Sequence, residues 1–287
     1  MDRAYTSPIY QLEDSDFNTL VDLALLEDLP QGDITTDALF SKEDACQARL
    51  YSKDSGVLCG TQVVNCLIRR TNANLIWNQI LAEGTKIESN QVIGTFAGSL
   101  ADLLKIERIL LNFIQYLSGI ATNAWSVSSK YPDLLILDTR KTLPGYRKLA
   151  KYAVYTGGGA NHRINLSDMA MLKDNHIAKA GDINTAVALV RSKNPDKKIE
   201  LEIDSLDQLK DAILSKPDII LLDNFSNADT ERAVEYIRKA DSKIRIECSG
   251  GITPDKLEYL SRFKNIGVSM GYLTHTVRFL DISLDIL

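Results

Sequence analysis

The sequence lacks any apolar run that approaches the roughly 18 residues of a membrane span. It also lacks a basic excess, because 33 Lys and Arg against 38 Asp and Glu leave a formal net charge of -5, whereas a nucleic-acid binder is normally basic. The first ten residues do not have the basic and then apolar pattern of a secretory signal. We therefore expect a protein that binds neither nucleic acid nor membrane.

Cysteine is sparse as well. The four cysteines, Cys46, Cys59, Cys66 and Cys248, are scattered, without a CxxC pair and without a nearby histidine. That spacing argues against a zinc site and against a disulfide framework. A reducing cytoplasm is the expected location.

The first third of the chain mixes helical and strand patterns. Residues 15–27 and 61–70 have the apolar spacing of amphipathic helices, and a longer helical stretch follows over 100–129. Short, alternating segments between glycines predict strands at 46–53, 73–80 and 91–98. This part is predicted to be a small α+β unit.

After Pro132 short apolar runs recur that have the length of buried strands. They are Leu134–Leu137, Met169–Leu172, Ile199–Ile203, Ile219–Leu222, Ile244–Cys248 and Ile266–Met270. Helix-length amphipathic segments, such as 183–193, 206–215 and 228–240, separate most of them. This alternation predicts parallel strands joined by crossover helices, either in an open doubly wound sheet or in a (β/α) barrel. We favour the barrel, because polar residues follow the strands in the way that builds the active face of barrels.

Cations are concentrated between Asp138 and Lys173, a window that contains seven Lys and Arg residues but only two acidic residues. Four of them, Arg140, Lys141, Arg163 and Lys173, lie at strand ends or beside glycines, which suits a multiply anionic substrate. The other three, Arg147, Lys148 and Lys151, are expected on a solvated helix face. The triple glycine 157–159 either terminates a helix or lets the backbone approach a ligand, and His162 after it is either a buried, satisfied histidine or a ligand contact.

Acidic and glycine-bearing strand ends complete the candidate site. Glu202 and Asp223 suit ribose hydroxyls or Mg²⁺, unless they only balance the nearby cations. Two late loops, 249–251 and 270–271, carry glycines where barrels often bind a phosphate through backbone N–H groups.

Longer motifs resemble one family in the same order throughout the chain. They include LLEDLPQGDITT, ERILLNFIQYLSGIAT, DTRKTLPGYRKLAKYAVYTGGGANHR, DMAMLKDNHI, IELEIDS, IILLDNF, ECSGGIT and YLTHTVRFLDISL. The sequence resembles the quinolinate phosphoribosyltransferase family over nearly its whole length. The resemblance implies an α/β protein with an N-terminal α+β open-sandwich domain, expected over 1–115, and an incomplete (β/α) barrel, expected over 116–275. A C-terminal tail, 276–287, would return to the first domain.

The resemblance also implies an activity. Members join quinolinate to phosphoribosyl pyrophosphate with Mg²⁺, giving nicotinate mononucleotide, pyrophosphate and CO₂, a step of NAD biosynthesis. By matching motif, the quinolinate carboxylates and a neighbouring phosphate would contact Thr139, Arg140, Lys141, His162, Arg163 and Lys173. Ribose and metal would contact Glu202 and Asp223, which we expect to be catalytic together with Lys141. The 5-phosphate would contact Ser249, Gly250, Gly251, Met270, Gly271 and Tyr272. Arg108 would reach the site of a partner subunit in a homodimer or higher oligomer.

One residue departs from the family pattern, and three alternatives stay open. The family usually has a small residue where this chain has Tyr272, so the phosphate loop is expected to differ or the ring to point away. A related branch associated with molybdenum transport shares the implied fold. A Schiff-base aldolase would use Lys173 as its amine. A non-catalytic protein would bind the same anions without turnover.

Overall fold

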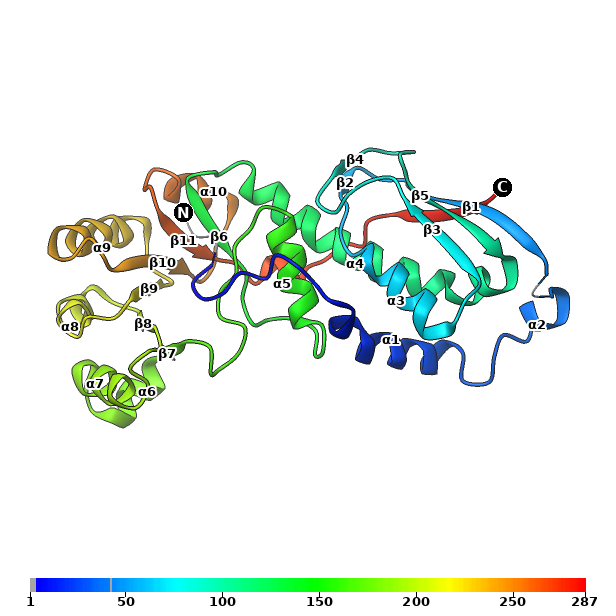
Figure 1. The fold of residues 1–287 in the computed structure, drawn as a ribbon. Coiled ribbons are helices and arrows are strands. Elements are labelled where there is room, and N and C mark those ends of the chain that lie inside the picture. The colour runs from blue at the N-terminus through cyan, green and yellow to red at the C-terminus, as the bar shows by residue number, and fades with distance from the viewer. Residues whose placement is uncertain (1–3, 42) are drawn as a thin grey trace. The chain divides into compact units, whose positions relative to one another are not determined.

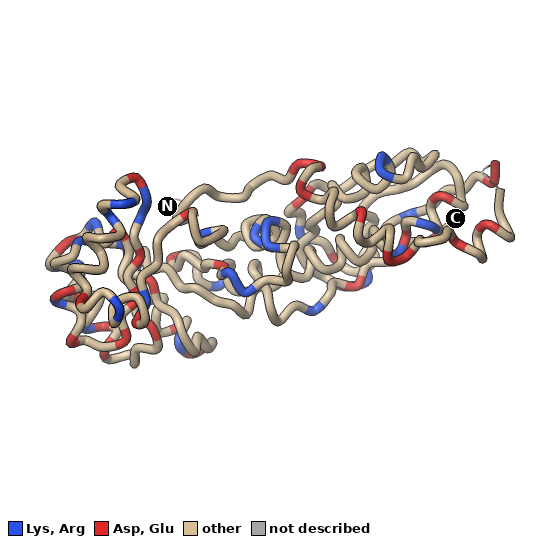
Figure 2. Tube along the Cα trace, turned by 90° about the horizontal axis from the view of Figure 1, so that it is seen from below, with Lys and Arg blue, Asp and Glu red and all other residues tan. Residues whose placement is uncertain are grey.

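The computed structural model describes residues 4–41 and 43–287, and the chain divides into two compact units. The parallel unit comprises the residues up to Pro8, Val127–Arg140 and Gly159–Gly271. The antiparallel unit comprises Ile9–Ser126, Lys141–Gly158 and Tyr272–Leu287. Figure 2 shows basic and acidic residues interspersed along the trace of both units. Among the described residues, no helix is both long and apolar enough to cross a membrane.

The parallel unit contains a six-stranded sheet. Its order is β6 (Leu134–Leu137), β11 (Ile266–Ser269), β10 (Arg245–Ser249), β9 (Ile219–Asp223), β8 (Ile199–Ile203) and β7 (Ala170–Leu172). Every neighbouring pair runs parallel, and most of the strand residues are buried, which is why these strands appear in the sequence as apolar runs. β6 and β7 form the two edges of the sheet. The predicted incomplete barrel is confirmed, and each strand end lies within one residue of its prediction.

Helices connect the strands of this sheet, and α7, α8 and α9 lie side by side along it in Figure 1. They are α6 (Asp174–Ala180), α7 (Ile183–Lys193), α8 (Leu209–Leu214) after the 3₁₀ turn η1 (Leu206–Gln208), α9 (Asn227–Ala240) and α10 (Pro254–Leu260). The Ser226 hydroxyl caps α9 by accepting from the backbone N–H of Asp229 at 3.1 Å. The helix buries Thr230, Ala233, Val234 and Ile237. This i, i+3, i+4, i+7 spacing is the amphipathic pattern that predicted the helix.

Two short segments lie beside the β6 edge of the sheet, outside its six strands. Ala160 forms a parallel bridge with Leu137 of β6, and Ala4 forms one with Asn161. The segment Ala4–Thr6, called the seam segment below, then reaches the β7 side, where the Thr6 hydroxyl donates to Asp168 Oδ2 at 2.8 Å. Its Tyr5 side chain is 1% exposed and packs in the core of the parallel unit. The seam segment therefore brings an aromatic residue from the chain start into the interior of the incomplete barrel.

The antiparallel unit is built on a four-stranded sheet. Its order is β12 (Ile282–Ile286), β1 (Ala45–Ser52), β5 (Val92–Ser99) and β3 (Leu75–Gln79), with antiparallel neighbours. A separate pair joins β2 (Gly56–Val57) to β4 (Lys86–Ile87). Because β12 pairs along β1, the last residues of the chain complete a sheet whose other strands come from its first third.

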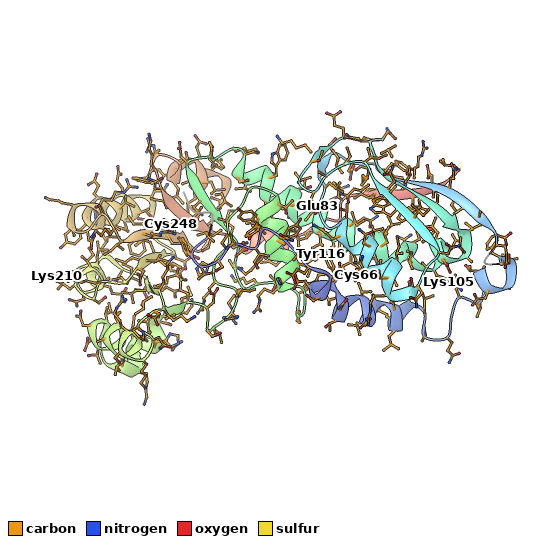
Figure 3. All side chains as sticks on the ribbon, viewed as in Figure 1. Cys66, Glu83, Lys105, Tyr116, Lys210 and Cys248 are labelled. Atoms are coloured by element: carbon orange, nitrogen blue, oxygen red, sulfur yellow. The ribbon has the colours of Figure 1, made fainter. Side chains whose placement is uncertain are left out.

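Within the described part of this unit, six helices belong wholly or mainly to it. They are α1 (Asp14–Asp28), α2 (Thr36–Leu39), α3 (Gln62–Thr71), α4 (Leu100–Ser128), α5 (Arg147–Thr156) and α11 (Tyr272–His275). The Glu83 carboxylate, labelled in Figure 3, accepts from the backbone N–H groups of Gly60 and Thr61 at 2.8 and 2.7 Å, where α3 begins. A carboxylate suits the positive end of a helix dipole. The Tyr152 hydroxyl of α5 donates to the same carboxylate at 3.1 Å, which ties α5 to the start of α3.

Candidate active site

Polar residues follow the parallel strands at their carboxyl-terminal ends, which lie on one side of the sheet. The register places Asp223 beside Ser249 and Ser269 beside Leu137, so neighbouring strands end side by side. The predicted residues on or just after these strand ends are Thr139, Arg140, Lys173, Glu202, Asp223, Ser249, Gly250, Gly251, Met270 and Gly271. The fold thus collects side chains that are up to about 130 residues apart in the sequence.

Two guanidinium groups, those of Arg140 and Arg163, are close enough for their charges to interact. The Arg140 Nε–H is buried and meets no acceptor among the described residues. Arg163 is 8% exposed and donates to the Met169 carbonyl at 3.0 Å. Burial lowers the pKa of Arg163, and the charge of Arg140 lowers it further. The charges of Glu200 and Asp168 act on the pKa of Arg163 in the opposite direction. A bound carboxylate or phosphate would supply the acceptor that the Arg140 Nε–H lacks among the described residues.

Lys173 and Glu202 form an ion pair at the carboxyl-terminal ends of β7 and β8. Lys173 Nζ lies 2.5 Å from Glu202 Oε2, and the side chains are 43% and 17% exposed. A Schiff-base aldolase would need this amine free to attack a carbonyl substrate. The contact with Glu202 therefore gives no support to the aldolase alternative.

The residues that could hold Mg²⁺ are Glu202 and Asp223 on neighbouring strands. Asp223 Oδ2 accepts from the Asn224 side chain at 2.8 Å, and Glu202 Oε2 is paired with Lys173. Each carboxylate retains its other oxygen for a further ligand. Mg²⁺ is commonly held by one or two carboxylates, several waters and substrate phosphates instead of a complete protein cage. The residues fit a metal bound in this way.

The loop after β10 is built for close backbone approach. Gly250 has a φ of +77°, and a Cβ there would lie 2.1 Å from Asn224 Oδ1. Gly251 has a φ of +52°, and a Cβ there would meet no atom of the described residues within 4 Å. Gly250 is therefore required by both conformation and packing, whereas Gly251 leaves open space beside the backbone. A group that binds through backbone N–H atoms could approach at Gly251.

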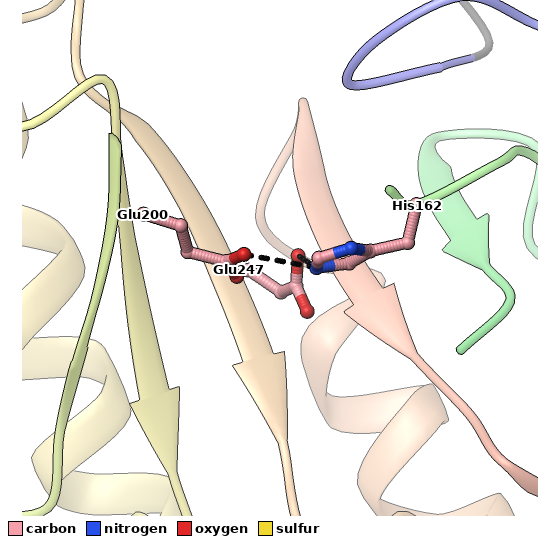
Figure 4. A group of neighbouring side chains, drawn as sticks. All are labelled: His162, Glu200 and Glu247. Carbon is pink, nitrogen blue, oxygen red and sulfur yellow. Dashed lines mark ion pairs between the residues drawn. The ribbon is translucent and has the colours of Figure 1, made fainter. Parts of the chain in front are cut away.

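A buried cluster of one histidine and two glutamates lies inside the parallel unit (Figure 4). His162 Nε2 lies 3.0 Å from Glu200 Oε2 and 3.6 Å from Glu247 Oε2. Both glutamates are fully buried, and His162 is 7% exposed. Burial raises the pKa of Glu247 to about 7, with the Glu200 charge as the next cause. Burial followed by the two carboxylate charges also raises the pKa of Tyr5 well above its usual value.

Three predicted site residues belong to the antiparallel unit. Arg108 is exposed on α4, and Tyr272 is 45% exposed at the start of α11. The Lys141 carbonyl accepts from the Thr274 hydroxyl at 2.7 Å, and its side chain is exposed. These observations leave the predicted roles of the three residues as predictions.

The structure bears on two interpretations of residues 147–159. The solvated helix face predicted for Arg147, Lys148 and Lys151 is wrong for Lys151, which is fully buried. The reason is that α5 buries six consecutive residues, Leu149 to Val154, and has no fully solvated side there. α5 ends at Thr156 with Gly157 as its C-cap, which agrees with the helix-termination alternative. Gly157 is also needed for packing, because a Cβ there would lie 2.1 Å from the Ala121 carbonyl oxygen of α4.

Comparison with known families is decisive. The family model described as quinolinate phosphoribosyl transferase, N-terminal domain, matches residues 33–118. The model described as quinolinate phosphoribosyl transferase, C-terminal domain, matches residues 120–285. The chain belongs to the quinolinate phosphoribosyl transferase family.

Relatives and solved structures agree with this family. A probable nicotinate-nucleotide pyrophosphorylase (carboxylating) from Bacillus subtilis (strain 168) is 40% identical over 267 residues, covering 91% of this chain and 90% of the relative. A nicotinate-nucleotide pyrophosphorylase (carboxylating) from Mycobacterium leprae is 37% identical, covering 96% of this chain and 100% of the relative. The structure of the nicotinate-nucleotide pyrophosphorylase from Francisella tularensis matches with a TM-score of 0.92 and 35% identity, covering 98% of this chain and 100% of that one.

Several buried residues of this family member were not predicted to belong to the site: Asp138, Glu200, Glu247 and Tyr5. Glu200 lies two residues before Glu202 on β8, and Glu247 lies two residues before Ser249 on β10. Each buried glutamate therefore shares a strand face with a predicted residue. Asp138 is fully buried and accepts from the Asn161 side chain at 2.7 Å and from the His162 N–H at 2.9 Å. The period of two along β8 and β10 was the signal that could have drawn attention to both glutamates. No sequence pattern pointed to Tyr5.

Proposed function

We propose that this chain transfers the phosphoribosyl group of phosphoribosyl pyrophosphate to quinolinate with loss of CO₂, giving nicotinate mononucleotide and pyrophosphate. Family membership and the names of the relatives support the reaction class. The observation that carries the proposal is that Arg140 and Arg163 are neighbours and that the buried Arg140 Nε–H, which meets no acceptor among the described residues, suits an anion. Quinolinate brings two carboxylates, and the second substrate brings phosphates.

The proposed contacts follow from charge and position. Arg140, Arg163 and Lys173 bind the quinolinate carboxylates, because guanidinium groups pair well with carboxylates and the ammonium adds a mobile charge. Glu202 and Asp223 accept from ribose hydroxyls at the ends of β8 and β9. The 5-phosphate binds through backbone N–H groups of the two glycine-bearing loops, 249–251 and 270–272, where Gly251 offers open space.

Mg²⁺ is proposed to bind with the pyrophosphate group, held by Glu202 and Asp223 together with substrate oxygens and water. When bound, the ion offsets the charge that develops on departing pyrophosphate. The two carboxylates have a further effect of their own. They stabilise the positive charge that appears on the ribose as its bond to pyrophosphate lengthens.

The proposed reaction has two steps, a substitution at the anomeric carbon and then replacement of CO₂ by a proton on the ring. The bond between the anomeric carbon and pyrophosphate breaks, and the pyridine nitrogen forms a new bond to that carbon. The ring then carries a positive charge and accepts the electron pair of the adjacent carbon–carboxylate bond as CO₂ leaves. That ring carbon finally takes a proton. Lys141 is proposed to stabilise the electron pair and to assist this protonation.

A homodimer in which Arg108 contributes to the partner's site is part of the proposal, as is a cytoplasmic location. All four cysteines are free thiols in the structure, which suits a reducing compartment. The exposed position of Arg108 on α4 is compatible with contact to another molecule.

The direct test supplies quinolinate, phosphoribosyl pyrophosphate and Mg²⁺, follows CO₂ and nicotinate mononucleotide, and runs nicotinate in parallel. Product from quinolinate alone supports the proposal, and no product from either acid contradicts it. The Arg163→Ala variant should weaken quinolinate binding roughly 30- to 100-fold, since a charged hydrogen-bonding partner is lost. The matched control is Lys210→Ala, an exposed cation of α8 labelled in Figure 3, which should bind normally.

A further inference from the structure

His162 directs both ring nitrogens toward protein groups. Its Nδ1 accepts a hydrogen bond from the Arg163 backbone N–H at 2.7 Å. Its Nε2 lies between the carboxylates of Glu200 and Glu247, at 3.0 and 3.6 Å. An Nδ1 that accepts a hydrogen bond carries no proton, so the neutral ring has its proton on Nε2, next to the carboxylates.

This tautomer decides between two uses of the cluster. A metal ion on Nε2 would require the ring proton on Nδ1, where it would face the Arg163 N–H donor. Histidines that ligate metals normally donate their other nitrogen to an acceptor, which is the reverse of the arrangement here. The geometry therefore favours a ring held by two carboxylates over a metal centre.

The ring determines the backbone that carries Arg163. Arg163 N is bonded to the ring, and His162 N donates to Asp138 Oδ1 at 2.9 Å. Asp138 lies two residues before Arg140, so the same contacts connect the β6 end with the loop of Arg163. A shift of the His162 ring would move the Arg163 backbone relative to Arg140.

Tyr5, which belongs to the seam segment, packs against the His162 ring of the cluster. Its ring centroid lies 5.3 Å from that of His162. A Cβ at position 267 would lie 2.1 Å from the Tyr5 hydroxyl, so the glycine of β11 makes room for that hydroxyl. The seam segment is held in place by Lys198, whose Nζ donates to the Tyr5 carbonyl at 2.6 Å.

We infer that Glu200, Glu247 and Tyr5 are positioning residues that hold the His162 ring with its proton on Nε2, and that the ring sets Arg163 for a substrate carboxylate. What Arg163 binds rests on the proposed function, whereas the state of the His162 ring does not.

Substitutions that remove or retain the acceptor next to Nε2 test the inference by calorimetric binding of quinolinate. Glu200→Met, which removes the acceptor, and His162→Phe should each raise the Kd about tenfold, as loss of groups that orient a ligand contact commonly does. Glu200→Gln retains an acceptor oxygen and should stay within about threefold of wild type. The Glu200→Met, His162→Phe double variant should also be about tenfold weaker and not a hundredfold, because both changes break one chain of contacts.

Several results would overturn the inference. They are an unchanged Kd in both single variants, an additive double variant, or a Glu200→Gln protein as weak as Glu200→Met. The control for general loosening of the core is Ile237→Val, fully buried on α9, which should lower the Tm and leave the Kd unchanged.

A second measurement does not depend on substrate. The chain has three histidines, so ¹⁵N-histidine labelling gives three ring systems, of which His162→Phe removes one. The His162 ring should show protonation at Nε2 alone at neutral pH, and Glu200→Met should shift its signals. Protonation at Nδ1, or stoichiometric metal that His162→Phe abolishes, would refute the inference. If wild type shows the Nε2 proton but neither binds quinolinate nor forms product, the proposed function fails while the ring state stands.

Discussion

Replacing Glu247 with Gln should change how the stability of the protein depends on pH. Burial and the Glu200 charge raise the pKa of Glu247 to about 7 from the ordinary 4.5. The groups that act on it are Glu200, His162, Ser269 and Tyr5. Because the folded state binds this proton more tightly than the unfolded state, the stabilising contribution is complete below the unfolded pKa and declines as pH rises toward 7.

The expected magnitude follows from those two values. Between pH 5 and pH 8 the wild type should lose roughly 2–3 kcal/mol of its free energy of unfolding through this group, and Glu247→Gln should lose none of it. The difference between variant and wild type should therefore move by that amount in favour of the variant. Exposed Glu235 of α9 provides the matched control, since Glu235→Gln should show the same difference at both pH values.

Urea unfolding followed by far-ultraviolet circular dichroism is the suitable assay. Both tryptophans, Trp77 and Trp125, lie in the antiparallel unit, so their fluorescence reports on the wrong part of the chain. A Glu247→Gln difference that is equal at pH 5 and pH 8 would show that the carboxyl has an ordinary pKa in the folded state, and the account of the buried cluster would be wrong.

Three further predictions concern the subunit contact, the phosphate loop and a helix cap. Arg108→Ala and Arg163→Ala proteins, mixed at a quinolinate concentration too low for either variant alone to turn over, should recover about a quarter of wild-type activity if Arg108 acts across a dimer. The reason is that half of the random dimers then contain one intact site. No recovery after confirmed subunit exchange would contradict this. Gly250→Ala should raise the KM for phosphoribosyl pyrophosphate and lower stability by roughly 1–3 kcal/mol, since the new Cβ clashes with Asn224 at a positive φ. Gly181→Ala is the control, because Gly181 has a positive φ but open space around it. Equal KM values in the two variants would refute the packing argument. Ser226→Ala should remove about 1 kcal/mol of stability in urea unfolding through loss of the α9 cap, with no change in quinolinate affinity.

Local patterns sufficed for most of the parallel unit. Leu134–Leu137 and Ile199–Ile203 are strands with the predicted bounds, and α7 begins and ends at the predicted residues 183 and 193. Such elements are readable because burial on both sheet faces gives continuous apolar runs, and burial on one helix face gives a period near 3.6. The same rhythm placed Lys173, Glu202, Asp223 and Ser249 at strand ends, since parallel strands joined by helices must end on one side.

Contacts between distant segments were not readable in this way. Tyr5 lies near the start of the chain, yet it packs against His162, and its hydroxyl occupies the space left by Gly267. Lys151 has the sequence context of a solvated cation but is buried, because α5 is covered over six consecutive residues. Hydrophobic periodicity describes one element at a time and does not specify which distant residue fills a given space.

The sequence by itself determined the order of strands and helices, the incomplete barrel and the family, because short apolar runs and long motifs are properties of contiguous residues. Only the tertiary structure decided that His162 is enclosed by Glu200 and Glu247 and that its Nδ1 accepts from Arg163. The protonation of a buried side chain depends on the polar groups around it in space, and these come from strands nearly fifty residues apart in the sequence.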